Sequence, residues 1–133
     1  MVFKLKKIIK TKEGDVLRFL REKELKEFSE IYFSEILPKK IKAWKKNNSI
    51  EQNIIVPHGN IKLAIIKNFD IKRLKIISLG KSYNYGIYKI PKNTWYGFKC
   101  IGKEKALIIN CISKTHNEKN NSKVNYDTFK IKW

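Results

Sequence analysis

The chain has 133 residues, of which 42% are hydrophobic and 32% are charged. These values fit one domain with a real core (residues 1–133) and exclude a disordered chain. No apolar run approaches the roughly 18 residues of a membrane-spanning helix, and the lysines scattered through MVFKLKKIIK are unlike a signal peptide. The sequence therefore predicts a cytoplasmic protein without a membrane segment.

The formal net charge is +18, and nearly all of the basic residues are lysines. Such a charge favours anionic partners, which include nucleic acid, anionic membrane surfaces and phosphorylated small molecules. The alternative is compositional, because a chain rich in Lys, Ile and Asn is typical of an A+T-rich genome and its lysines then lie on solvated faces. Both interpretations stay open at this stage.

The N-terminal part of the chain predicts short strands. Residues 1–13 have apolar residues among lysines and are typical of a strand, and residues 11–15 form a turn. Val16–Leu20 is a second apolar run. Glu22–Phe28 contains helix-forming residues but is too short for more than a single turn.

The stretch from Glu30 to Lys67 predicts successive strands of the central sheet system. Its β-branched and aromatic runs are Ile31–Phe33, Ile41–Trp44, Asn53–Val56 and Ile61–Ile66. Turn residues separate them, as in the segment PHGN. Short strands at this spacing predict a β-sandwich or barrel.

The C-terminal half continues the pattern. We predict further strands over Ile71–Leu79, Tyr83–Ile90, Trp95–Cys100 and Ala106–Ile112, then a polar loop over Ser113–Val124, and strand-like alternation over Tyr126–Trp133 with a packed terminal Trp133. Cys100 and Cys111 lie in apolar surroundings, so we expect buried free thiols rather than a disulfide. The fold class predicted is all-β.

The spacing of polar residues matches a loose motif of the cupin class, the double-stranded β-helix or jelly-roll barrels. Gly59 takes the place of the closing glycine and Gln52 that of the acid. Lys45 and Asn47 occupy the two histidine positions, and Tyr96 occupies the histidine position of the second motif, PKNTWY. Because none of these four side chains is a usual ligand of a divalent ion, the sequence predicts a cupin barrel without a metal or other cofactor.

Three blocks of the chain resemble the dTDP-4-dehydrorhamnose 3,5-epimerase family and its short relatives in nucleotide-sugar pathways: EIYFSEILPKKIKAW, EQNIIVPHGNIKLAII and IPKNTWYGFKCIGKEKALIINC. The resemblance runs from about Gly14 to Trp133. It implies a metal-free cupin barrel that acts on a nucleotide sugar. It also implies a homodimer that pairs through an extra strand at a sheet edge, for which the N-terminal strand is the candidate.

The resemblance implies epimerisation next to the ketone of a 4-keto-6-deoxy sugar, which needs a base, an acid and a group that stabilises the enolate. The base position of the family, a histidine, holds Lys45. A lysine is a poor base unless burial or a neighbouring cation, here Lys46, lowers its pKa. His116 lies near the family's acid, and Tyr96 is expected to point into the barrel and donate to a carbonyl. The alternatives are a surface histidine and a core tyrosine.

The candidate substrate-binding residues lie on or beside strand ends: Lys42, Lys46, Gln52, Asn53 and Trp95. Lys42, Lys45 and Lys46 can hold a diphosphate as point charges. The resemblance places Lys42 at the position of a family arginine that contacts the diphosphate. The alternative is a solvated lysine run. Strand alternation places one of Gln52 and Asn53 inward and the other outward. Trp95 can stack on a sugar or base, but we favour packing.

Three functions follow from these observations. The first is a nucleotide-sugar epimerase or isomerase of polysaccharide biosynthesis, favoured by the barrel spacing. The second is a non-catalytic cupin that binds a sugar nucleotide or a partner enzyme through a degenerate site, favoured by the lysine at the base position. Nucleic-acid binding has the charge and the aromatic residues Tyr83, Tyr85 and Tyr88, but it lacks a recognisable motif and is disfavoured.

Overall fold

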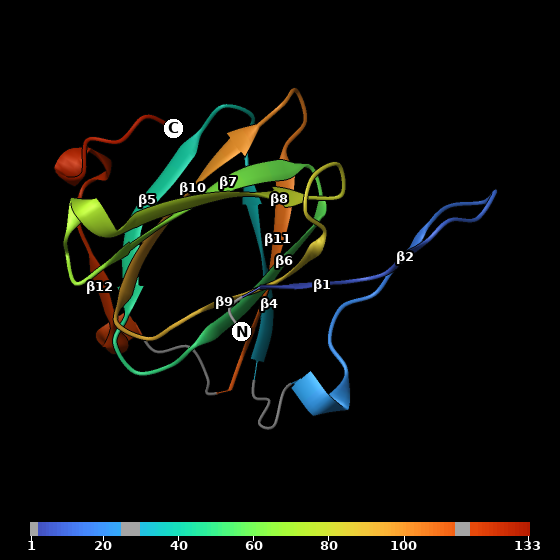
Figure 1. The fold of residues 1–133 in the computed structure, drawn as a ribbon, viewed down its shortest axis with the longest axis horizontal. Coiled ribbons are helices and arrows are strands. Elements are labelled where there is room, and N and C mark those ends of the chain that lie inside the picture. The colour runs from blue at the N-terminus through green and yellow to red at the C-terminus, as the bar shows by residue number, and fades with distance from the viewer. Residues whose placement is uncertain (1–2, 25–29, 114–117) are drawn as a thin grey trace.

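The structure, a computed structural model, describes residues 3–24, 30–113 and 118–133. Two five-stranded antiparallel sheets face each other and form a barrel (Figure 1). The first sheet contains, in spatial order, β1 (Phe3–Leu5), β9 (Gly86–Ile90), β6 (Gln52–His58), β11 (Ala106–Ile112) and β4 (Glu30–Ile36). The second contains β12 (Asn121–Lys123), β5 (Ile41–Asn47), β10 (Thr94–Ile101), β7 (Asn60–Lys67) and β8 (Leu74–Gly80). The predicted all-β cupin fold is confirmed.

Four short 3-10 helices complete the described elements: η1 (Glu22–Glu24), η2 (Ile71–Arg73), η3 (Glu118–Asn120) and η4 (Tyr126–Thr128). Within the described ranges, no helix has the length and apolar character that crossing a membrane requires.

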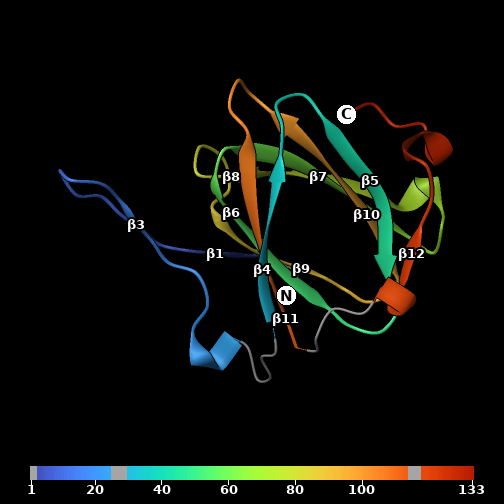
Figure 2. The ribbon, with the colours of Figure 1, turned by 180° about the vertical axis from the view of Figure 1, so that it is seen from behind.

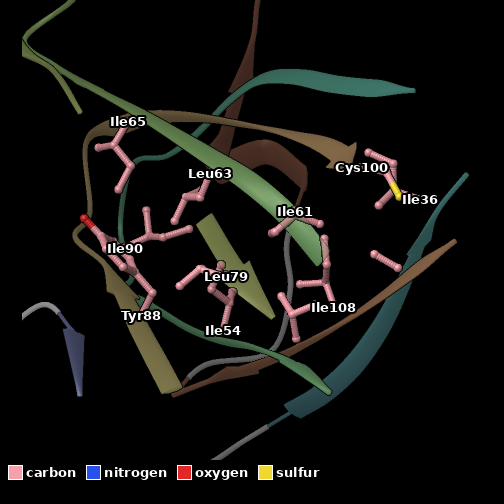
Figure 3. Packing of buried hydrophobic residues seen from close by; sticks show 12 residues of the cluster. Ile36, Ile54, Ile61, Leu63, Ile65, Leu79, Tyr88, Ile90, Cys100 and Ile108 are labelled. Carbon is pink, nitrogen blue, oxygen red and sulfur yellow. The ribbon is translucent and has the colours of Figure 1, made fainter. Parts of the chain in front are cut away.

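The main core lies between the two sheets, and strand alternation explains its composition. On β7, Ile61, Leu63 and Ile65 point into the barrel, whereas Ala64 and Ile66 point to the outside of the sheet. Figure 3 shows the inward side chains of both sheets converging in the barrel interior. Burial of each large aliphatic side chain stabilises the fold by about 1.5–3 kcal/mol. This core fills most of the barrel and leaves polar residues at one end.

The C-terminal segment covers the outer face of the second sheet. Phe129 and Trp133 pack on the buried Trp44, at ring-centroid distances of 5.2 and 5.4 Å. The Trp44 indole N–H donates to the backbone carbonyl of Tyr126 at 3.0 Å. In Figures 1 and 2 this segment runs beside β5 and β12. The predicted packing of Trp133 is confirmed, and it ties the end of the chain to the strand that carries Lys45.

The N-terminal segment forms an arm. Its hairpin, β2 (Ile8–Ile9) and β3 (Val16–Leu17), stands away from the barrel in both Figures 1 and 2. The base of the arm packs on a cluster formed by Ile55, Tyr85 and Ile87, on the outer face of the first sheet. The predicted strand over residues 1–13 is therefore interrupted, because β1 pairs with β9 whereas β2 pairs with β3.

Four predicted elements differ from the structure. Residues 71–73 are a 3-10 turn and not the start of β8, because the Asp70 side chain accepts from the Lys72 amide at 3.0 Å and caps that turn. Residues 83–85 precede β9 and lie outside it. Residues 121–123 form β12 within the predicted loop, whereas residues 126–133 form a 3-10 turn and an irregular segment instead of a strand. The strand β12 is polar, so periodicity gave no sign of it.

The two cysteines are free and buried, as predicted. Cys100 belongs to the barrel core, where its thiol donates to the backbone carbonyl of Glu104. Burial raises the pKa of the Cys111 thiol, which keeps it protonated at neutral pH. Both behave as small hydrophobic side chains.

Candidate active site

A cavity of about 490 Å³ opens where β4, β6 and β10 begin and β5 ends. Polar and charged side chains from five strands line it: Glu30, Tyr32, Lys45, Asn47, Gln52, Tyr96, Asn121 and Lys123. A smaller pocket of about 80 Å³ adjoins it, since Tyr32, Lys45 and Tyr96 line both. A hollow of this size, with polar walls above an apolar core, is typical of a small-molecule site.

The four positions that correspond to the cupin metal ligands all line this cavity. They do not fit a divalent cation, because Lys45 brings a positive charge and the side-chain oxygens of Asn47 and Gln52 already accept hydrogen bonds. The Asn47 oxygen accepts from the amides of Ser49 and Ile50, both at 3.0 Å. Nowhere in the described ranges do three or more His, Cys, Asp or Glu side chains gather in a way that could hold a metal.

A β-bulge in β5 orients the lysines of this strand. Tyr96 and Gly97 of β10 lie opposite Lys45 and Ala43, so Trp44 has no partner on β10. The extra residue changes the alternation and places Trp44 outside the barrel and Lys45 inside. A Cβ atom on Gly97 would lie 2.5 Å from the Ala43 Cβ, so this close approach requires glycine.

The three lysines predicted to bind a diphosphate do not form one cluster. Lys42 and Lys45 line the same smaller pocket, and the Lys42 ammonium donates to a backbone carbonyl of β4 at 2.5 Å. Lys46 points away, and its ammonium lies 5.2 Å from the ring centroid of Trp95. Lys123 of β12 is the residue opposite Lys45 in the sheet, and it lines the cavity. The cavity lining therefore contains Lys45 and Lys123, whereas Lys46 lies outside it.

A buried hydrogen-bond network forms one wall of the cavity. The Asn110 amide donates to the Tyr32 hydroxyl at 2.8 Å and to the Gln52 side-chain oxygen at 2.7 Å. The Tyr96 hydroxyl donates to the same Gln52 oxygen at 3.3 Å. Gln52 and Asn110 are only 3% and 7% exposed, so the network holds both tyrosine rings in place. Among the residues that the structure describes, the buried side-chain oxygen of Asn110 has no hydrogen-bond partner.

The two tyrosines of the network are proton donors at neutral pH. Burial raises the pKa of Tyr96, and the bond to Gln52 offsets this only in part. Burial also raises the pKa of Tyr32, and the nearby charges of Tyr96 and Glu30 raise it further. Since an unperturbed tyrosine already titrates near 10, both hydroxyls stay protonated and can serve as donors to a carbonyl or enolate oxygen. The Tyr96 hydroxyl does so by exchanging its hydrogen bond to Gln52 for one to the bound molecule.

The other predicted residues lie elsewhere. Asn53 faces outward on β6 and lines a separate cavity of about 270 Å³ beside the N-terminal segment, whereas Gln52 faces inward, as strand alternation predicts. Trp95 is buried in the outer cluster against Phe69, at 5.7 Å between ring centroids, so the expected packing is confirmed. His116 lies outside the described residues.

Several lining residues were absent from the predicted site. Glu30 and Tyr32 alternate along β4, and their polar side chains on an inward face were a usable signal. Asn110 interrupts the apolar run ALIINCI, which was a second signal. Asn121 and Lys123 come from a strand without a recognisable pattern and could not be found from the sequence.

The fold and part of the sequence are shared with known proteins. A dTDP sugar isomerase from Desulfovibrio desulfuricans G20 is 33% identical, with a TM-score of 0.87 over 94% of this chain and 83% of that one. A dTDP-6-deoxy-D-glucose-3,5-epimerase from Legionella pneumophila, in complex with dTDP-4-keto-L-rhamnose, has a TM-score of 0.79 at 14% identity, covering 98% and 77% of the two chains. At that identity the likeness shows the fold alone.

A probable low-salt glycan biosynthesis epimerase from Haloferax volcanii is 29% identical over 84 residues, which are 59% of this chain. The match spans about half of that protein, 53% of its length. No protein-family model matches the chain.

Proposed function

The chain belongs to the family of dTDP-sugar isomerases and dTDP-4-dehydrorhamnose 3,5-epimerases, and we propose that it moves a proton next to the carbonyl of a dTDP-4-keto-6-deoxyhexose-type nucleotide sugar. The setting that we propose is polysaccharide biosynthesis in the cytoplasm, and the buried free thiols fit a reducing compartment. The observation that carries the proposal is the cavity wall in which Tyr32 and Tyr96 stand as protonated donors beside Lys45.

The reaction class explains why such a site is useful. Removal of a proton next to a ketone leaves negative charge on the carbonyl oxygen, and fixed donors aimed at that oxygen lower the barrier. The tyrosine hydroxyls supply neutral donors, and the Lys45 ammonium supplies a positive charge. Lys46, the neighbouring cation that could lower the pKa of Lys45 and make it a base, lies on the other face of β5 over the Trp95 ring. We therefore assign Lys45 the role of stabilising the enolate.

A pair of lysines on the second sheet supports the proposal that the cavity binds the diphosphate. Lys45 and Lys123 are directly opposite each other on adjacent antiparallel strands, and both line the cavity. Two like charges in this arrangement repel each other, and a bound anion relieves that repulsion. The buried oxygen of Asn110 supports a further contact, since it can accept from a sugar hydroxyl.

The second candidate function is sugar-nucleotide binding without turnover. It is favoured by one observation, the lysine at the position where the family carries its base. The two functions differ in one measurable property, because only an enzyme exchanges the protons next to the ketone with solvent.

We expect the wild-type protein to incorporate deuterium at C3 or C5 of dTDP-4-keto-6-deoxyglucose in deuterated buffer, followed by NMR. Lys45→Met should abolish this exchange, because it removes the charge and keeps an unbranched side chain. Lys62→Met is the matched control, since Lys62 lies between two inward residues of β7 and faces outward.

Saturable binding of dTDP without exchange by the wild type would favour the non-catalytic function. If the wild type neither binds dTDP nor exchanges protons, both candidate functions are refuted. Exchange that survives in Lys45→Met would remove Lys45 from the reaction.

We also propose that the protein is a homodimer that pairs through the outer face of the first sheet. Strand β4 ends that sheet, and its outward residues Phe33 and Ile31 are 64% and 46% exposed. Ile109, opposite Phe33 on β11, extends this apolar face toward the N-terminal arm. An exposed apolar face on an edge strand marks an interaction surface.

Sedimentation should show a dimer for the wild type at micromolar concentration and a monomer for Phe33→Asp, because a carboxylate cannot be buried unpaired in the interface. Tyr83→Asp is the matched control, since Tyr83 is 58% exposed in a loop outside this face. A monomeric wild type, or a dimer that persists in Phe33→Asp, would contradict the proposal.

A further inference from the structure

We infer that Glu30 is the general base, the group that takes the proton from the carbon next to the carbonyl. This inference rests on the proposed isomerase function and names the residue that begins the reaction. It gives the role of the base to a carboxylate instead of to Lys45, the residue at the family's base position.

The fold places Glu30 inside the site. It is the first residue of β4 and pairs with Ile112 of β11, which anchors the backbone of the strand at that point. Its side chain lines the cavity together with Tyr32, two residues further along the same face. Gln52 and Tyr96 approach the same cavity from β6 and β10. A sugar that fills the cavity therefore meets the carboxylate and the tyrosine donors together.

The chemistry of the other lining residues supports the assignment. Glu30 is the one acidic side chain among the described residues that line the cavity. The ammonium groups of Lys45 and Lys123 have no lone pair to accept a proton, and carboxamides such as those of Gln52 and Asn47 are not bases in water. The tyrosine hydroxyls stay protonated and act as donors. A carboxylate is also a common base for the removal of protons next to carbonyl groups.

The interaction between Glu30 and Tyr32 gives a second, independent line of support. The negative charge of Glu30 lies near enough to the Tyr32 hydroxyl to raise its pKa, in addition to the larger effect of burial. Two neighbouring titratable groups held in opposite protonation states are the arrangement that acid–base catalysis uses. Glu30 is then the acceptor and Tyr32 the donor.

The step balances without any further reactant. The Glu30 carboxylate takes the proton, the electron pair of the C–H bond forms the C=C bond of the enolate, and the electron pair of the C=O bond moves to the oxygen. That oxygen receives hydrogen bonds from the tyrosine hydroxyls and faces the positive charge of Lys45. Return of a proton to carbon from the opposite side inverts the centre, whereas return from Glu30 restores it. In deuterated buffer the proton on Glu30 exchanges with solvent, so either route incorporates deuterium.

The test is Glu30→Gln, which keeps the shape of the side chain and removes the basic oxygen. Deuterium incorporation into dTDP-4-keto-6-deoxyglucose should fall by at least about 100-fold, whereas the dissociation constant for dTDP, measured by calorimetry, should stay within about threefold. Glu30→Asp should retain partial activity. Glu35→Gln is the matched control on the same strand, because Glu35 is exposed and contacts Lys105 at 3.2 Å.

A pH profile separates a base from a residue that merely supports the fold. The pH dependence of the wild-type exchange rate should contain a step that Glu30→Gln lacks, because the variant has no carboxylate to act as base. If the wild type exchanges protons and Glu30→Gln does so at the same rate, the assignment of Glu30 as the base is overturned, but the isomerase proposal stands. A wild type that binds dTDP but exchanges no proton would overturn the isomerase proposal and the assignment with it.

Discussion

Replacement of Trp44 by alanine is expected to lower the free energy of unfolding by about 3–5 kcal/mol, the range of large-to-small changes at buried aromatic residues. The Trp44 side chain is 1% exposed and packs against Phe129 and Trp133. Its loss leaves a cavity and removes the hydrogen bond to the Tyr126 carbonyl. Both effects act at the contact between the second sheet and the C-terminal segment.

Urea unfolding followed by circular dichroism measures this change. Trp44→Phe should cost less, because it keeps an aromatic ring in the cluster. Ile76→Ala is the control on β8 of the same sheet, and since Ile76 is 40% exposed, its effect should stay within about 0.5 kcal/mol. A loss of less than about 1 kcal/mol in Trp44→Ala would show that the C-terminal segment contributes little to stability.

The same substitution should also weaken the site. The backbone of Trp44 exchanges two hydrogen bonds with Val124, at 3.1 and 3.2 Å, and this pairing continues β12 beyond Lys123. When the C-terminal segment detaches, β12 loses its anchor and Lys123 leaves the cavity. Limited proteolysis in Trp44→Ala should therefore cut within residues 124–133, and bound dTDP should slow this cleavage.

Replacement of Tyr96 by phenylalanine is expected to reduce the rate of proton exchange at the ketone by about 10²–10³-fold, the effect of removing one preorganised donor to a developing oxyanion. The ring keeps its packing against the barrel core and Phe98, at 5.4 Å between centroids. Gln52 still accepts from Asn110, so stability should change by no more than about 1.5 kcal/mol. Affinity for dTDP should stay within about threefold.

NMR detection of deuterium in dTDP-4-keto-6-deoxyglucose measures the rate, and Tyr88→Phe is the matched control. Tyr88 is also a buried tyrosine whose pKa burial raises, but it belongs to the core cluster and is not among the residues that line the cavity. If Tyr96→Phe exchanges protons at the wild-type rate, the Tyr32 hydroxyl is the tyrosine donor that stabilises the enolate. Equal losses in the two variants would point to a general effect on packing.

Local patterns along the chain were sufficient to predict the barrel and the loss of the cupin metal ligands. Alternation of apolar residues marks β6, β7, β10 and β11, since burial of one face requires a period of two. Motif spacing also placed Lys45, Gln52 and Tyr96 in one region, and all three line the cavity. These predictions succeed because each depends on local order along the chain.

The combination of side chains in the site depends on contacts between strands that are distant in the sequence. The bulge at Trp44 arises where β10 and β5 meet, and it directs Lys45 inward. The polar strand β12 forms because it can pair with the edge of β5, and this pairing brings Lys123 to the cavity from a part of the chain 78 residues after Lys45. Pairing between distant strands depends on backbone hydrogen bonds, which leave no side-chain pattern in the sequence.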